Sequence, residues 1–376
     1  MVLSKLSLVQ FRNYAEQQVS FSPKINLIFG SNGHGKTNLI EAIHVLALSK
    51  SFRTHQAADL ISRGSQEFYL VGEVLTEGRK LVLSLEQNQT RKVLQVNNSK
   101  QDVFSYVQYL PLVAFSTAHI EQFKSESEQR RRLIDRGLYQ LQPAHLRRLS
   151  EYYRVIRQKN SLLRKTPSVY NRDSAELIEV WNLQIADLGA RIIESRSAYI
   201  DKISSKLADA SQQLTPEVSD VRYVACNEII SKTGLVDIKD QLYRKLIQNR
   251  DREIRLGRSL VGPHRDEILI EIDGKSAQRY ASAGQFRSSL LAYYMAQIEV
   301  AFERQGEYPV FLIDDVDSEL DKTRIHRLLT ILEGKTQVFV TTTKPELIQM
   351  NCPAERVRAF RVESGCIKEV SSQYIH

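Results

Sequence analysis

The stretch Gly30-Ser31-Asn32-Gly33-His34-Gly35-Lys36-Thr37 satisfies the phosphate-loop pattern G-x-x-x-x-G-K-[ST] at every fixed position. Residues 25–29 before it are apolar and strand-like, and residues 38–48 after it have the apolar spacing of a helix with one buried face. Glycines let successive backbone N–H groups turn toward one centre, and the helix start adds partial positive charge. We therefore expect all eight residues to cradle an anion, with Lys36 at the β- and γ-phosphates and the Thr37 hydroxyl on Mg²⁺. The alternative is a glycine turn that binds nothing.

A second segment supplies the carboxylates that such a site needs. Residues 309–313 read as a buried strand that ends on Asp314 and Asp315. This order predicts that Asp314 holds the Mg²⁺ shell and that Asp315 polarises an attacking water. Lys36, Asp314 and Asp315 are thus the candidate catalytic residues, and Thr37 and Asp314 the candidate metal ligands. The alternative is a buried strand that ends in a solvated acidic turn.

A third segment, Ala281-Ser282-Ala283-Gly284-Gln285, is a small polar turn that opens an apolar helix. A helix start of this kind attracts anions, although many helices are simply capped this way. Its position favours a functional role, because it precedes the acidic strand and Ser318-Glu319-Leu320-Asp321 follows that strand.

Composition is that of a soluble globular protein. The chain has 376 residues, of which 42% are hydrophobic and 26% charged, enough for two or three domains. No signal-type segment or membrane-length apolar run is present, which favours the cytoplasm. Cys226, Cys352 and Cys366 lack metal-ligand spacing, so we expect reduced thiols and neither a disulfide framework nor a zinc site.

The periodicity changes twice along the chain. Strand-like segments at 68–74, 80–85 and 93–96 give way to helical spacing from about residue 120 to 255, and alternation returns at 268–272. We expect an α/β head formed by residues 1–118 and 257–376, with an inserted all-helical arm at 119–256.

The net charge of +8 favours a polyanionic partner. Residues 121–165 hold twelve Lys and Arg against five Asp and Glu. A solvated helical face is the usual meaning of such a run. The alternative is a DNA-binding surface, for which the candidates are Arg130, Arg131, Arg132, Arg147, Arg148, Arg154, Arg157 and Lys159.

The order of these motifs resembles the ABC-type ATPase head of the SMC family and, within it, the RecF family of bacterial recombination mediators. The resemblance covers nearly the whole chain. It rests on the segments quoted above and on several further motifs. These are Phe11-Arg12-Asn13-Tyr14, Ser51-Phe52-Arg53-Thr54, Arg131-Arg132-Leu133-Ile134-Asp135, Gln158-Lys159-Asn160-Ser161-Leu162-Leu163 and Gly262-Pro263-His264-Arg265-Asp266.

The resemblance implies an α/β P-loop ATPase head with an inserted arm and, as cofactors, ATP with Mg²⁺. Two heads would enclose two ATP molecules. Ser282 and Gly284, which share a motif with Gln285, would contact the γ-phosphate of the ATP bound by the opposite protomer. It further implies an ATP-gated homodimer with weak, DNA-dependent ATPase activity that binds double-stranded and gapped DNA. Such a protein would act in replication, recombinational repair and the SOS response, and would help RecO and RecR to load RecA at junctions of single- and double-stranded DNA.

Some features depart from this pattern or leave alternatives open. Many ABC ATPases carry a switch histidine at the position where this chain has Thr341-Thr342-Thr343-Lys344. Residues 115–119 lack the Pro-Glu pair that the family pattern has at this point. We expect His119, a lone histidine in that segment, to have a structural role rather than a catalytic one. One alternative function is a transporter-type nucleotide subunit; another is an interaction protein in which the nucleotide is structural. A GTPase is disfavoured because no Asn-Lys-x-Asp motif follows the phosphate loop.

Overall fold

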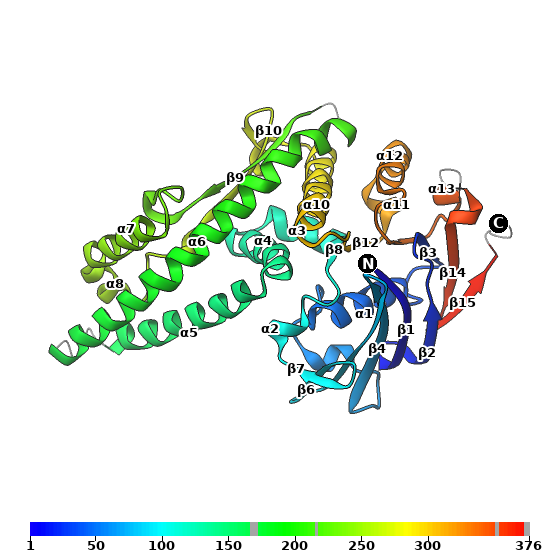
Figure 1. The fold of residues 1–376 in the computed structure, drawn as a ribbon, viewed down its shortest axis with the longest axis horizontal. Helices are drawn as coiled ribbons and strands as arrows, with labels where there is room; N and C mark the ends of the chain where they lie inside the picture. Colours follow the sequence, from blue (N-terminus) through cyan, green and yellow to red (C-terminus); the bar gives the residue numbers. More distant parts are fainter. Residues whose placement is uncertain (166–171, 215–216, 350–352, 372–376) are drawn as a thin grey trace. The chain divides into compact units, whose positions relative to one another are not determined.

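The computed structural model describes residues 1–165, 172–214, 217–349 and 353–371 (Figure 1). It divides into two compact units. The first contains residues 1–121, 206–218 and 281–376, and the second contains residues 122–205 and 219–280.

A six-stranded sheet at the centre of the first unit carries the phosphate loop. Its order is β15-β14-β3-β13-β12-β8, in which only β15 is antiparallel to its neighbour. The strands are β3 (Ile25–Phe29), β8 (Leu112–Phe115), β12 (Val310–Ile313), β13 (Val338–Thr342), β14 (Val357–Glu363) and β15 (Cys366–Val370). Strands β3, β8, β12 and β13 are buried at every position, as parallel strands covered on both faces require.

The second sheet of this unit is antiparallel, in the order β2-β1-β4-β5-β6-β7. Its strands are β1 (Val2–Phe11), β2 (Tyr14–Ser20), β4 (Glu67–Thr76), β5 (Arg79–Asn88), β6 (Lys92–Val96) and β7 (Ser99–Gln101). Helix α1 (Lys36–Leu48) contacts strands of both sheets, so nearly all of its residues are buried. Gly72 permits this approach, because a Cβ there would lie 2.4 Å from the Leu46 side chain.

The described part of the first unit also contains the following α-helices, of which α3 crosses the boundary between the units. They are α2 (Val103–Tyr106), α3 (Thr117–Lys124), α10 (Ala283–Gln305), α11 (Val316–Glu319), α12 (Lys322–Leu332) and α13 (Glu346–Gln349). The strands expected at 68–74, 80–85, 93–96 and 309–313 are confirmed as β4, β5, β6 and β12.

The second unit is mostly helical. It contains α4 (Ser127–Leu141), α5 (Pro143–Lys165), most of α6 (Arg172–Leu214), α7 (Leu235–Gln248), α8 (Arg250–Leu256) and α9 (Ala277–Tyr280). Its apolar core gathers residues of α5, α6 and α7, including Tyr152, Ile185 and Leu242. It also holds a three-stranded antiparallel sheet, β11-β10-β9, formed by β9 (Ser219–Val224), β10 (Glu267–Ile272) and β11 (Lys275–Ser276). The arm is therefore not all-helical.

The limits of the units differ from the predicted head and arm. Residues 257–280 belong to the second unit, because β10 pairs with β9. Residues 206–218 belong to the first, where Lys206 lies 2.5 Å from Glu303 and Arg327 Nη1 donates to the Leu214 carbonyl at 3.1 Å. Both differences arise from long-range contacts, which local periodicity does not report.

A buried ionic cluster in the second unit joins two of the sequence motifs, Arg131–Asp135 and Gly262–Asp266, through their aspartates. Arg196 is fully buried and donates to both carboxylate oxygens of Asp135, at 2.9 and 2.8 Å, and to Asp266 at 2.8 Å. Tyr223 also donates to Asp266, and His145 Nε2 lies 2.9 Å from Asp135. Burial of unpaired charge is costly, so these groups stabilise the unit only as a set.

No helix within the described ranges is long and apolar enough to cross a membrane. Cys226 is a buried free thiol and Cys366 an exposed one, whereas Cys352 lies outside the described residues.

Candidate nucleotide site

The phosphate loop connects β3 to α1 and has the backbone that its glycines predict. Gly30, Gly33 and Gly35 have φ values of 146°, 80° and 122°, which side chains with a Cβ rarely adopt. A Cβ on Gly30 would lie 2.4 Å from the Val362 carbonyl oxygen. Lys36 Nζ donates to the carbonyls of Gly30 and Ser31 at 2.8 and 3.1 Å, which keeps the ammonium at the loop.

The Phe11–Tyr14 motif forms the β1–β2 turn that supports the loop from outside. Tyr14 donates its hydroxyl to the Gly35 carbonyl at 2.9 Å, and Asn13 Nδ2 donates to the His34 carbonyl at 2.9 Å. Burial raises the pKa of Tyr14, so the phenol remains a donor. These two hydrogen bonds tie the backbone of the phosphate loop to the β1–β2 turn.

Glu41 on α1 joins two further motifs to the loop helix. Its side chain is fully buried and accepts from Arg12 at 2.7 and 2.8 Å, from Arg53 at 3.3 Å and from Ser51 at 2.5 Å. The motifs at 11–14 and 51–54 therefore meet on a single carboxylate. Glu41 was not predicted from the sequence, because a lone acidic residue on an apolar helix face carries no motif.

The loop helix and the acidic strand meet at Thr37 and Asp314, which are 277 residues apart in sequence. Thr37 Oγ1 donates to Asp314 Oδ1 at 3.1 Å, and Thr341 Oγ1 lies 2.7 Å from the same oxygen. Burial raises the pKa of Asp314, while the hydroxyls of Thr341 and Thr37 oppose that rise. A hydroxyl and a carboxylate side by side are a donor set that suits Mg²⁺. Among the described residues no group of three or more His, Cys, Asp and Glu could hold a metal ion.

Asp315 leaves the strand in a left-handed conformation, with φ 55° and ψ 53°. Its N–H donates to Thr341 Oγ1 at 2.7 Å, which supports this unusual backbone. Burial lowers the pKa of Lys36, and the charges of Asp315, Asp317 and Asp314 oppose that shift. The ammonium and the acidic loop therefore interact electrostatically across the site.

At the position of the switch histidine, this chain has threonines whose hydroxyls bind the aspartates that follow β12. Thr342 Oγ1 and Thr343 Oγ1 donate to Asp317 at 2.7 and 2.6 Å, and Thr341 contacts both Asp314 and Asp315. The end of β13 thus fixes the acidic loop. In the sequence these threonines stand out only as a departure from the family pattern.

The Ser-x-Gly-Gln motif starts α10 as a capping box. Ser282 Oγ accepts from the Gln285 N–H at 3.2 Å, and Gln285 Oε1 accepts from the Ser282 N–H at 3.0 Å. Gln285 is thereby engaged within its own helix turn. Space above Gly284 is open, since a Cβ on this residue would have Arg324 Nη1 as its nearest neighbour, at 3.8 Å. Arg324 is in turn held by Asp321 of the Ser-Glu-Leu-Asp segment at 2.7 Å.

His119 has structural surroundings. It is 1% exposed, lies beside the rings of Phe52 and Tyr294, and its Nδ1 is 2.7 Å from Ser116 Oγ.

Three of the eight candidate DNA contacts are buried in the second unit, which corrects their assignment. Lys159 is fully buried between Glu253 and Asn182, at 2.6 and 2.7 Å. Arg131 donates to the Asp266 carbonyl at 2.5 Å, and Arg130 pairs with Glu267. A buried cation is costly without its partner and is not accessible to a ligand. These three residues therefore stabilise the fold.

The other five candidates remain accessible on α4 and α5. Arg132 is half exposed and pairs with Glu128 at 2.6 Å, while Arg147, Arg154 and Arg157 are exposed and Arg148 is partly exposed. Their contact with DNA stays a prediction.

Comparisons with known proteins identify the family. The profile described as RecF/RecN/SMC N terminal domain matches residues 2–368. A protein of Listeria innocua named DNA replication and repair protein RecF is 36% identical over 372 residues, which cover 98% of this chain and 100% of that relative. The chain belongs to the RecF family.

Solved structures agree with membership of the RecF family. One described as the recombination mediator protein RecF-ATPrS in the RecFOR pathway matches with a TM-score of 0.90 and 27% identity over 98% of both chains. An Smc head domain from Pyrococcus furiosus matches with a TM-score of 0.56 and 18% identity over 98% of this chain and 95% of that one, which shows the fold alone. The predicted fold class, an SMC-like ABC-type ATPase head with an inserted arm, is confirmed.

Proposed function

We propose that this member of the RecF family is an ATP-dependent DNA-binding protein of replication and recombinational repair. ATP closes two copies into a dimer on double-stranded or gapped DNA, and slow hydrolysis of ATP reopens it. In this proposal, closed dimers help RecO and RecR to load RecA at junctions of single- and double-stranded DNA during repair and the SOS response. A solved RecF described as part of the RecFOR pathway supports the assignment of these partners.

The observation that carries the proposal is the hydrogen bond between Thr37 and Asp314 at 3.1 Å. It brings a phosphate-binding loop and a buried acidic strand to one place, as ATP hydrolysis requires. Lys36 would neutralise the β- and γ-phosphates, Thr37 and Asp314 would hold Mg²⁺, and Asp315 would orient the attacking water. Bound Mg²⁺ would stabilise charge on the transferred phosphoryl group.

The capping box of Ser282 and Gln285 supports a dimeric site. Ser282 is exposed, and no described atom covers Gly284 closely, so the helix start can receive the γ-phosphate held by a second protomer. Asp315 has a shorter side chain than glutamate, which agrees with slow turnover. Energy from binding ATP, rather than fast hydrolysis, would then control how long the heads stay closed.

The DNA surface of the proposed dimer includes Arg132, Arg147, Arg148, Arg154 and Arg157. Guanidinium groups on one long helix and its neighbour suit a phosphate backbone, which they bind without reading sequence. Cytoplasmic location follows from this role. The alternative function is an interaction protein in which the nucleotide stabilises the fold without significant turnover.

One experiment separates these functions. ATP hydrolysis and oligomeric state are measured together, by phosphate release and light scattering, with no DNA and with duplex, single-stranded or gapped DNA. The proposal predicts an ATP-dependent dimer whose turnover rises with duplex or gapped DNA. A monomer at saturating ATP, or turnover that no DNA changes, would reject the gated dimer. Binding of ATP without any hydrolysis would favour the alternative.

A further inference from the structure

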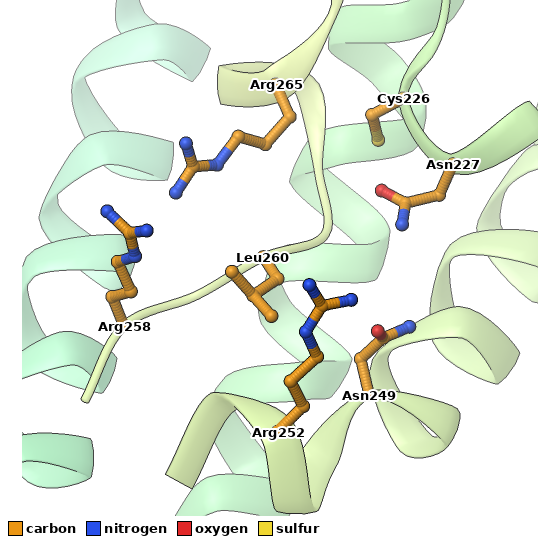
Figure 2. Close-up of a pocket in the computed structure, with 7 residues that line it drawn as sticks. All are labelled: Cys226, Asn227, Asn249, Arg252, Arg258, Leu260 and Arg265. Atoms are coloured by element: carbon orange, nitrogen blue, oxygen red, sulfur yellow. The ribbon is translucent and has the colours of Figure 1, made fainter. Parts of the chain in front are cut away.

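The second unit contains a pocket of about 320 Å³. Of its lining residues, only Arg265 belongs to a motif used above, Gly262–Asp266. Figure 2 shows its lining: Cys226, Asn227, Asn249, Arg252, Arg258, Leu260 and Arg265. In this view Arg258 and Arg265 extend from one side of Leu260, and Arg252 rises from α8 beside Asn249 and Asn227. All seven residues belong to one compact unit, so the pocket does not depend on the position of the other.

The charge of this pocket is not neutralised within the described residues. Arg252 and Arg258 have no carboxylate partner there, and Arg265 donates only to the Ser259 carbonyl, at 3.2 Å. All three arginines are exposed, so they retain free N–H groups. The neighbouring Glu253 is buried and already engaged with Lys159 at 2.6 Å.

The remaining lining is neutral and polar, although Asn249 Nδ2 already donates to the Lys245 carbonyl at 2.9 Å. Asn227 and Asn249 contribute carboxamides, and Leu260 gives one apolar wall. Burial raises the pKa of the Cys226 thiol to about 12, so no thiolate opposes an anion. Asn227 has a φ of 53°, a left-handed conformation that asparagine tolerates.

Guanidinium forks bind phosphate in a bidentate manner. Three guanidinium groups around one pocket carry more positive charge than the single negative charge of a phosphodiester requires. They fit a group with two or more negative charges. We propose that this pocket binds a phosphate monoester or pyrophosphate group, separately from the nucleotide site. Such a group occurs at a 5′-phosphorylated DNA end and on a free nucleotide.

This inference does not rest on the proposed function, because no lining residue belongs to the phosphate loop, the acidic strand or the predicted DNA surface. Its sequence signal is residues 244–265, which hold seven Lys and Arg against two Asp and Glu.

The test is arginine labelling with phenylglyoxal on the full chain, read by peptide mass spectrometry, with inorganic pyrophosphate as the probe. Pyrophosphate is expected to slow labelling of Arg252 and Arg258 about tenfold or more. Arg255 provides the internal control, because it is exposed on the same helix but does not line the pocket. Equal protection of Arg255, or no protection of Arg252 and Arg258, would overturn the proposal.

A binding measurement makes the same test independent of labelling. Calorimetry with pyrophosphate uses a Lys36→Ala chain, which weakens binding at the phosphate loop. Adding Arg252→Gln and Arg258→Gln is expected to lower the remaining affinity about tenfold or more, since each removes a charged hydrogen-bond donor. Adding Arg255→Gln instead is expected to change it less than about twofold. An equal fall in affinity from the two changes would indicate a diffuse charge effect and refute the pocket.

Further labelling arms in the Lys36→Ala chain distinguish the sources. Protection by a 5′-phosphorylated duplex but not by its 5′-hydroxyl twin would support a DNA end as the ligand, and protection by ADP would support a nucleotide. Equal protection by both duplexes would show that backbone phosphodiesters suffice, which would contradict a site for doubly charged groups.

Discussion

At the scale of single residues, Glu41 is the carboxylate on which the surroundings of the phosphate loop depend. It is fully buried and accepts from two arginines and a serine that come from separate turns. A buried ion pair stabilises the folded state only while both charged partners are present. The loop helix is thus held in place by an interaction that is sensitive to the removal of one charge.

We predict that Glu41→Gln lowers the free energy of unfolding by about 3 kcal/mol, the lower end for a buried ion pair, because it leaves the partly buried Arg12 without its counterion. Urea unfolding measures this. Glu128→Gln is the matched control: it breaks the exposed pair with Arg132 and should cost less than about 1 kcal/mol. Similar costs for the two variants would contradict the role assigned to Glu41.

Thr341 is a positioning residue for Asp314. Thr341→Val keeps the volume but removes the hydroxyl at 2.7 Å from Asp314, so we expect Mg²⁺ affinity to fall about 10–100-fold, as for other supporting groups of metal sites. The measurement is the Mg²⁺ dependence of ATP hydrolysis. Thr341→Ser, which retains the hydroxyl, should restore most of the affinity. A purely packing role would give the opposite order, with serine worse than valine.

His264 makes the second unit sensitive to acid. Burial lowers its pKa to about 3, and the charges of Arg265, Arg131 and Lys159 add to this effect. Its unfolded pKa is about 6.5. The folded state therefore resists protonation, so the contribution of His264 to stability is complete above about pH 6.5 and is lost as pH falls toward 3.

We predict that His264→Gln reduces the slope of unfolding free energy against pH by about 1.4 kcal/mol per pH unit between pH 6 and 4. His145, Asp135 and Asp266 titrate in the same unit, so the informative quantity is the difference between variant and parent. Urea unfolding across this range measures it. An unchanged slope in His264→Gln would show that His264 does not control it.

At the scale of elements, the start of α10 is prepared for an anion. Ser282 and Gln285 satisfy each other's N–H groups, which fixes the first turn and leaves Gly284 open. Arg324 on α12 adds a cation beside Gly284, a group that the motif alone does not reveal.

We predict that Ser282→Arg leaves ATP binding by the monomer intact but abolishes ATP-induced dimerisation, because a long cation would block the partner's γ-phosphate. Light scattering with and without ATP measures the oligomeric state. Ser288→Ala, on the same helix but in a buried position, controls for damage to α10. An unaltered ATP-dependent dimer in Ser282→Arg would exclude a contact between protomers at this residue.

At the scale of the whole molecule, the excess positive charge is shared between structure and recognition. Lys159, Arg130 and Arg131 hold the second unit together, and the remaining arginines of α4 and α5 are accessible. The local excess of charge therefore overstates the number of groups available to DNA.

We predict that charge reversal of Arg147 and Arg148 to Glu weakens duplex binding and flattens its salt dependence by up to about 0.9 in log–log slope for each phosphate that is no longer neutralised. The same reversal at Arg154 and Arg157 should act similarly. Fluorescence anisotropy from low to moderate salt measures both. Lys232→Glu, exposed elsewhere in the second unit, is the control. A slope that neither double variant alters would place the DNA surface elsewhere.

The sequence by itself determined the parts of this protein whose chemistry is local. The phosphate loop, its helix and the acidic strand were predictable because glycine conformations and apolar runs are properties of neighbouring residues, and the structure has them at Gly30–Thr37 and β12. Tertiary structure alone decided which groups support them. Glu41 gathers two distant turns, Thr341 reaches Asp314 from another strand, and β10 joins β9 across the helices and loops between them. It also decided which cations are buried in ion pairs, because burial and ion pairing depend on contacts between residues far apart in the chain.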